Sequence, residues 1–277
     1  MLTLTLRCQP EGRIRADAIA ADRLAGLSRE EIGALLLWPS RGGSGTSRRA
    51  GVGLGEVFRI EGKPGSDVRV LGELDRVDGL GTRMGSGTLT IDGNAGRDVG
   101  REMTGGRINI TGNVAERAGM AMAGGLIAAA GSAGASVGGA LPGGSRGMTG
   151  GEIVVRGDAG PEAGSRARRG LIVIGGDTED GAGRSMIAGT LVIVGRAKGG
   201  VGEWNKRGSI IAIGGAAVPV GYRYACSYAP EYLRLLFRHA AQLGVPVEAG
   251  VSSGRFARHC GDLALLGKGE LLLWTAS

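Results

Sequence analysis

The chain has 277 residues, enough for one large domain or two ordinary ones, and glycine is its most unusual feature, with 57 glycines against only 8 prolines. Collagen is excluded because glycine does not recur at every third position, and a hydrophobic content of 42% argues against disorder. The net charge of +7 favours an anionic partner, while an aromatic content of 4% argues against a base-stacking surface for nucleic acid.

The cysteines and the apolar runs indicate the compartment. Cys8, Cys226 and Cys260 match no metal or disulfide spacing, so we interpret them as reduced thiols. The first twenty residues lack the apolar core of a signal peptide, and no uninterrupted apolar run is long enough for a membrane span. We therefore expect a cytoplasmic protein without membrane contact.

Residues 1–50 form an expected N-terminal α+β cap region. An alternating apolar pattern predicts a strand at Leu2–Leu6. In "SREE" (28–31), Ser28 is an N-cap and Glu31 its capping-box partner, which predicts a helix start. The polar, glycine-rich segment 40–51 follows.

Residues 51–215 are dominated by a 19-residue repeat, interrupted once by a spacing of 26 that places a seven-residue insertion within 138–151. The second and fourth residues of most copies are large and apolar, which predicts a short strand with one buried face. Glycines recur at fixed phases after each strand and mark sharp corners. The copies begin at Thr88, Arg107, Leu126, Glu152, Leu171, Thr190 and Ser209.

A unit of 19 residues is too short for a propeller blade and cannot bury a core alone, so the copies must stack. We predict an all-β fold, a parallel β-helix that is right-handed by the general crossover preference. Residues 67–87 are a variant coil, and 57–62 are expected to form a further, truncated rung. Methionines that share one phase are interpreted as core fillers.

Residues 216–277 are expected to form a C-terminal helix and strand cap. In segment 229–244, Pro230 lies in the first turn of a helix and Gly244 ends it. Leu233, Leu236, Phe237 and Ala240 form one apolar face. We expect this helix to cover the open end of the stack, a role compatible with docking on a partner protein.

Catalytic and metal chemistry are not indicated. His239 and His259 stand beside scattered cysteines without metal-ligand spacing. The glycine motifs at 52–57 and 267–270 lack the residues that a dinucleotide or phosphate loop requires. We predict no catalytic residue and no metal ligand on this chain.

Basic residues outside the strands are the candidate binding residues. Equal phases stack into columns, so Arg101 and Arg184 are expected to share one column, and Arg169 and Arg207 another. A solvated surface is the competing interpretation. The residues predicted to bind a long anion are Arg101, Arg117, Arg166, Arg168, Arg169, Arg184, Lys198, Lys206 and Arg207.

The 19-residue cycle, with "G-N/D" after the strand and "M-x-G-G" before the next one, resembles the glycine-rich β-helix of glutamate synthase and of the C subunit of formylmethanofuran dehydrogenase. The insertion (141–151), the "YACSYAPEYLRLLFRHAAQLGV" segment (224–245) and "RHCGDLALLGKGELLLW" (258–274) resemble the second family. Members of that family occur in a molybdenum or tungsten formylmethanofuran dehydrogenase and in a bacterial formyltransferase/hydrolase complex. The Ala-, Arg- and Gly-rich composition favours the bacterial complex.

The resemblance implies a non-catalytic scaffold subunit in one-carbon metabolism. Amidohydrolase-like and formyltransferase-like partners would move a formyl group from formyl-tetrahydromethanopterin to a methanofuran-type carrier (methylofuran) and hydrolyse it to formate. The carrier belongs to the complex, and this chain alone binds no cofactor. The carrier's polyglutamate tail is the anion that the basic residues would hold. A dehydrogenase subunit, a purely structural assembly subunit and a glutamate synthase-like spacer remain alternatives, and nucleic-acid binding is the least favoured.

Overall fold

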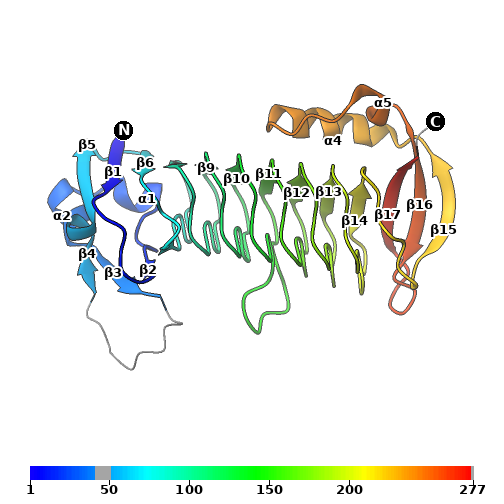
Figure 1. Cartoon of the computed structure of the whole chain (residues 1–277), viewed down its shortest axis with the longest axis horizontal. Coiled ribbons are helices and arrows are strands. Elements are labelled where there is room, and N and C mark those ends of the chain that lie inside the picture. Colours follow the sequence, from blue (N-terminus) through cyan, green and yellow to red (C-terminus); the bar gives the residue numbers. More distant parts are fainter. Residues whose placement is uncertain (41–50, 276–277) are drawn as a thin grey trace.

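The computed structural model describes residues 1–40 and 51–275. Most of the strands belong to one 13-stranded sheet, in the order β15-β16-β17-β14-β13-β12-β11-β10-β9-β8-β6-β1-β5. Few helices accompany it, which confirms the all-β prediction. The molecule is elongated, with its two ends at opposite extremes of the long axis (Figure 1).

The central part of the sheet is a parallel stack, here called the ladder, in which each strand pairs with the strand one repeat later. Leu89 lies opposite Ile108, Ile108 opposite Ile127, and Ile127 opposite Ile153. Every predicted strand start is confirmed. The ladder strands are β6 (Asp67–Leu71), β8 (Thr88–Asp92), β9 (Arg107–Ile110), β10 (Leu126–Ala129), β11 (Glu152–Val155), β12 (Leu171–Ile174), β13 (Thr190–Ile193) and β14 (Ser209–Ala212).

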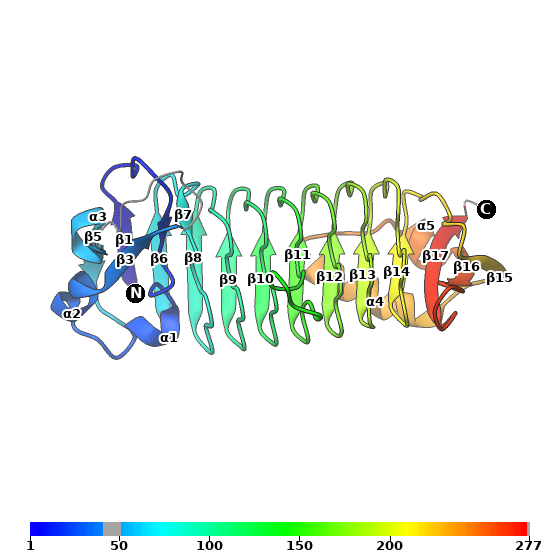
Figure 2. The ribbon, with the colours of Figure 1, turned by 90° about the horizontal axis from the view of Figure 1, so that it is seen from below.

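A second line of parallel bridges closes each coil on another side. It runs from Leu74 through Ala95 and Val114 to Ala216, again at one residue per coil. The same strand, corner and return path is repeated along the axis, as Figure 2 shows from below. The 19-residue period is therefore the length of one coil.

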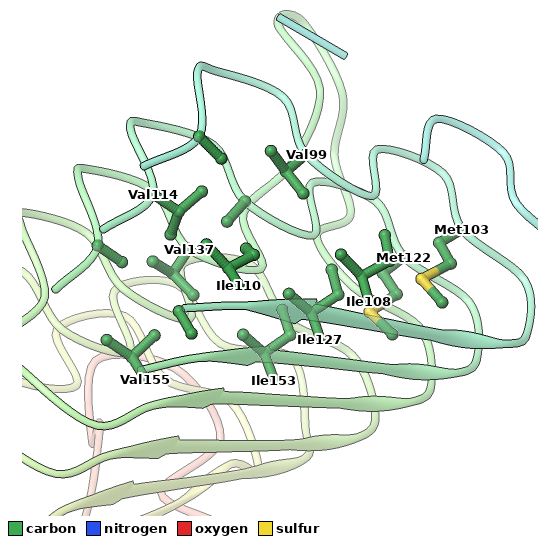
Figure 3. Close-up of a cluster of buried hydrophobic side chains, with 14 of the residues drawn as sticks. Val99, Met103, Ile108, Ile110, Val114, Met122, Ile127, Val137, Ile153 and Val155 are labelled. Carbon is green, nitrogen blue, oxygen red and sulfur yellow. The ribbon is translucent and has the colours of Figure 1, made fainter. Parts of the chain in front are cut away.

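The interior of the ladder holds inward aliphatic side chains and the predicted methionine fillers (Figure 3). Ile108, Ile127 and Ile153 follow one another from strand to strand along the ladder, and Met103 and Met122 lie beside them. The corner glycine Gly119 has φ +64°, and a Cβ there would overlap with the Ile153 side chain. Both the backbone conformation and the space beside Ile153 therefore favour glycine at this corner.

The N-terminal end uses a different pattern. β1 (Leu2–Leu6) pairs in parallel with β6 and in antiparallel with β5 (Phe58–Gly62). The expected rung at 57–62 is therefore wrong: only residues 63–66 separate β5 from β6, too few for a parallel crossover. The remaining elements there are β2 (Ile14–Arg15), β3 (Leu36–Pro39), β4 (Val52–Gly53), β7 (Val77–Asp78), α1 (Ala21–Leu24), α2 (Arg29–Ala34) and α3 (Leu54–Val57).

The capping box at the start of α2 is confirmed. The Ser28 hydroxyl accepts from the Glu31 amide at 3.2 Å, and the Glu31 carboxylate accepts from the Ser28 amide at 2.8 Å. The polar segment that follows this region overlaps residues 41–50, which lie outside the described residues.

The C-terminal end is closed by strands. β17 (Gly269–Thr275) pairs in parallel with β14, and β16 (Arg255–Gly261) and β15 (Arg223–Tyr228) continue the sheet in antiparallel order. Helix α4 (Glu231–Gln242) begins after Pro230, and the turn at Gly244 follows its end, as predicted. The short helix α5 (Ala249–Ser252) follows.

Helix α4 does not cover the open end, contrary to the expectation. It lies along the outer face of the sheet over the C-terminal coils (Figure 1). Its buried Leu233 and Phe237 belong to a second apolar core with outward strand residues such as Val173 and Val192. Because these outward residues are apolar, they require a cover along the side of the ladder.

Candidate functional site

A cationic groove lies at one edge of the C-terminal coils, at the corner that precedes each strand. Its volume is about 710 Å³. The insertion between β10 and β11 and the loop between β16 and β17 project on this same edge (Figure 1). The groove is lined by Arg146, Arg168, Arg169, Gly170, Ile187, Ala188, Gly189, Thr190, Lys206, Arg207 and Leu266.

The repeat positions the cations. Arg168–Arg169, Ile187–Ala188 and Lys206–Arg207 occupy equal phases of three successive coils. Backbone hydrogen bonds fix the three corners, including the Lys206 amide to the Met186 carbonyl at 2.8 Å. Two cationic pairs thus flank one uncharged rung, and two coil spacings place them about 9–10 Å apart along the axis.

The insertion and the closing hairpin bound the groove. Arg146 comes from the insertion, at the end nearest β11, while Leu266 comes from the loop between β16 and β17. A ligand in the groove therefore meets cationic side chains on the ladder and one more cation on a loop.

The cations of the groove have no acidic partner among the described residues. Of the described residues, those that line it include no carboxylate. No ion pair within residues 1–40 and 51–275 involves Arg146, Arg168, Arg169, Lys206 or Arg207. Guanidinium groups without intramolecular partners form strong, charge-assisted hydrogen bonds to carboxylates and phosphates, so the arrangement suits an anion.

Other predicted binding residues are placed in ion pairs instead. Arg117 donates to both oxygens of the nearly buried Asp98 carboxylate, at 2.7 and 3.0 Å. This hydrogen bond raises the pKa of Arg117. Arg101 lies 3.8 Å from Asp17 and 3.8 Å from Glu102. Arg101 thus connects the N-terminal end to the first coils, and Arg117 connects two successive coils.

Ion pairs between coils also engage Arg184 and Lys198. Arg184 donates to Glu203 at 2.9 Å. Lys198 donates to Glu179 at 2.6 Å, and this hydrogen bond raises the pKa of Lys198. Arg166 donates to the Gly144 carbonyl at 2.7 Å.

The structure thus brings together Arg168, Arg169, Lys206 and Arg207 and places the other five predicted residues elsewhere. Ligand binding by all nine stays a prediction. Sequence reasoning missed Arg146, because the insertion takes it out of the repeat phase. Its signal was the chemistry of the insertion: one arginine in an otherwise uncharged, glycine-rich segment.

The two histidines lie apart from the groove. His239, on α4, has Nε2 3.0 Å from both oxygens of Glu152, and His259, on β16, packs edge-on against Tyr224. Within the described residues, no group of three His, Cys, Asp or Glu side chains is arranged to hold a metal ion. Nor does any helix of that part of the chain have the length and apolarity to cross a membrane.

The fold and the groove together define an elongated β-ladder protein with a cationic edge. No family model matches the sequence. Over its whole length the chain is similar to a chain in the crystal structure of the formyltransferase/hydrolase complex FhcABCD from Methylorubrum extorquens with methylofuran. The two are 33% identical with a TM-score of 0.88, over 99% of this chain and 100% of that one.

A curated relative points to the same family. Over 92 residues the chain is 36% identical to the C subunit of molybdenum-containing formylmethanofuran dehydrogenase 1 from Methanosarcina barkeri (strain Fusaro / DSM 804). The alignment spans 31% of this chain and 28% of that protein's length. The chain belongs to the family that unites the formylmethanofuran dehydrogenase C subunit with its counterpart in the formyltransferase/hydrolase complex.

Proposed function

We propose that this chain is the scaffold subunit of a formyltransferase/hydrolase complex, in which partner subunits transfer a formyl group to a methanofuran-type carrier and hydrolyse it to formate. The observation that carries the proposal is the whole-length similarity to a chain of the FhcABCD complex, over 99% of this chain. The elongated ladder suits a scaffold, because its coils hold partners apart at a fixed distance. We further infer that the ladder is a right-handed parallel β-helix, by the crossover preference.

The groove supplies the ligand contact in this proposal. The carrier's tail of glutamates is a flexible polyanion, and the groove presents five cations and no carboxylate among its described lining residues. Holding the tail there leaves the formyl-bearing end free to move between partner active sites. The residues assigned to this contact are Arg146, Arg168, Arg169, Lys206 and Arg207.

Membership of a formylmethanofuran dehydrogenase is the second candidate, favoured by the 36% identity to the C subunit of the molybdenum-containing enzyme. In this candidate too, we propose that the chain is a non-catalytic subunit. Any metal would belong to other subunits in either complex.

Reconstitution distinguishes the candidates. The chain is co-expressed with amidohydrolase-like and formyltransferase-like subunits from the same genome, and formate release from formyl-tetrahydromethanopterin is measured with and without it. We expect a stable complex whose formate release depends on this chain. Equal formate release without it, or assembly only with molybdenum- or tungsten-dependent subunits, contradicts the first proposal.

A further inference from the structure

The insertion is held against the ladder at two points that bracket Arg146. The Gly147 amide donates to the Arg166 carbonyl at 2.7 Å, and the Arg166 guanidinium donates to the Gly144 carbonyl at 2.7 Å. Arg166 therefore contacts the insertion on both sides of Arg146 with its backbone and its side chain. A short internal bond, from the Gly144 amide to the Leu141 carbonyl at 2.7 Å, closes the turn.

The insertion requires such a clamp because it departs from the ladder. Residues 141–147 contain three glycines, Gly143, Gly144 and Gly147, which have the largest conformational freedom to lose. The coil hydrogen bonds resume at Met148, whose amide donates to the Gly138 carbonyl at 2.8 Å. Within residues 141–147, the Arg166 side chain ties the tip of the insertion to the neighbouring coil through its hydrogen bond to the Gly144 carbonyl.

We propose that Arg166 is a positioning residue, whose guanidinium holds the insertion so that Arg146 lines the groove and contributes to anion binding. This deepens the proposed function, on which it rests. Arg166 is not one of the described residues that line the groove, and its Nη1 is engaged by a carbonyl. Its effect on binding passes through Arg146. The gain is preorganisation: Arg146 is ordered before the ligand arrives.

Binding of fluorescent hexaglutamate to the full chain tests this coupling, with Arg146→Ala, Arg166→Ala and the double variant compared at one ionic strength. We expect Arg146→Ala to weaken binding about tenfold, as for one lost charge-assisted hydrogen bond, and Arg166→Ala about fivefold. The double variant should bind no more weakly than Arg146→Ala, because Arg166 acts only through the Arg146 side chain, which both variants lack. Losses that add in the double variant make Arg166 a direct ligand and overturn the proposal.

Two variants control for charge and chemistry. Arg196→Ala removes one exposed cation outside the groove and should leave hexaglutamate binding within about twofold of the parent. Arg166→Lys keeps the charge, but its ammonium lies one bond closer to the backbone than Nη1 and reaches the Gly144 carbonyl less well, so it should recover only part of the affinity. Full recovery by lysine indicates a charge effect and contradicts the positioning role.

Hydrogen exchange keeps the inference testable without a ligand. In Arg166→Ala, the amides of residues 144–147 should exchange at least tenfold faster, while the β12 and β13 amides keep the parent rates. Unchanged exchange at 144–147 overturns the clamp. Faster exchange together with no hexaglutamate binding by the parent chain supports the clamp and overturns the proposed ligand of the groove.

Discussion

The coils before the insertion and those after it share one repeat but differ on their outer surfaces. At the corner before the strand, the earlier coils carry Thr104–Gly105 and Ala123–Gly124, and the later ones carry Arg168–Arg169 and Lys206–Arg207. At Gly124 a Cβ would overlap with the Thr104 carbonyl oxygen. The later corners accommodate long side chains at the same phase and form the groove.

The outward strand positions differ in the same way. Thr90 and Asn109 are half-buried on the earlier strands, whereas Val173 and Val192 are buried beneath α4. The inward residues that build the coil stay apolar throughout. Outward positions are therefore free to specialise, because coil geometry depends on inward residues and corners.

The largest effect is expected when helix α4, which covers the later coils, loses its packing against the sheet. Phe237 is buried between α4 and the sheet, so Phe237→Ala should lower the free energy of unfolding by about 3–5 kcal/mol in urea titrations. Hydrogen exchange should then accelerate in β12 and β13 and not in β8. Leu235→Ala, at a residue 66% exposed on the same helix, is the control and should change stability little. Equal losses for both variants would show that α4 contributes no specific packing.

The next largest effect concerns the stability contributed by the glycines at the coil corners. Gly119 and Gly143 have φ of +64° and +74°, but only Gly119 has a neighbour, the Ile153 side chain, where its Cβ would lie. Alanine at either position should cost about 1–2 kcal/mol for the left-handed backbone. Gly119→Ala should cost a further 1–3 kcal/mol, roughly, for overpacking. Thermal unfolding of the two variants measures the difference, and equal midpoints would refute it.

A smaller effect, on anion binding, distinguishes the arginines that line the groove from those held in ion pairs. Arg169→Ala and Arg207→Ala should each weaken hexaglutamate binding about tenfold, an effect that decreases at high salt. Arg117→Ala should leave binding unchanged, because its guanidinium is paired with Asp98. It should instead lower stability, because the nearly buried Asp98 carboxylate loses both hydrogen bonds and keeps, among the described residues, only Arg15 at 3.9 Å. Titrations at two salt concentrations, with unfolding curves, make the comparison. Weaker binding in Arg117→Ala would show that predicted binding residues outside the groove also contact the anion.

The smallest effect concerns the closure of the later coils at high pH. The Tyr222 hydroxyl donates to the Gly202 carbonyl at 2.9 Å, and burial raises the pKa of Tyr222 from 10.0 to about 12. Folding favours the neutral phenol, so its contribution is complete below pH 10 and is lost as the pH rises towards 12. Tyr222→Phe should cost about 1 kcal/mol at neutral pH.

The comparison for Tyr222 is between the parent and this variant, since other tyrosines also titrate at high pH. Stability should fall less steeply in Tyr222→Phe between pH 10 and 12. If the stability of the two proteins fell equally between pH 10 and 12, the raised pKa of Tyr222 would not be the cause of the loss.

Local patterns predicted much of the fold. The strand starts, the Leu2–Leu6 strand, the Ser28–Glu31 capping box and helix α4 follow from periodicity and capping chemistry, which act over a few residues. The rung expected at 57–62 was wrong because its apolar pattern is equally compatible with antiparallel pairing to β1. Strand patterns do not encode their partners.

The candidate site was predictable only in part. Phase relations correctly grouped Arg169 with Arg207, since equal phases stack. They could not separate cations that face carboxylates one coil away, such as Arg184 beside Glu203, from cations without such partners. Pairing depends on side-chain direction and on neighbouring coils, which one-dimensional spacing does not contain.

The amino-acid sequence by itself determined the coil: its length, its inward aliphatic residues and its glycine corners, because each is a local requirement repeated in phase. Only the tertiary structure decided where α4 lies, which strand forms the first rung, and which cations remain unpaired beside the insertion. These depend on contacts that the repeat pattern does not specify. Arg146 and Arg166 are the clearest case, since their relation exists only where the insertion folds back on the next coil.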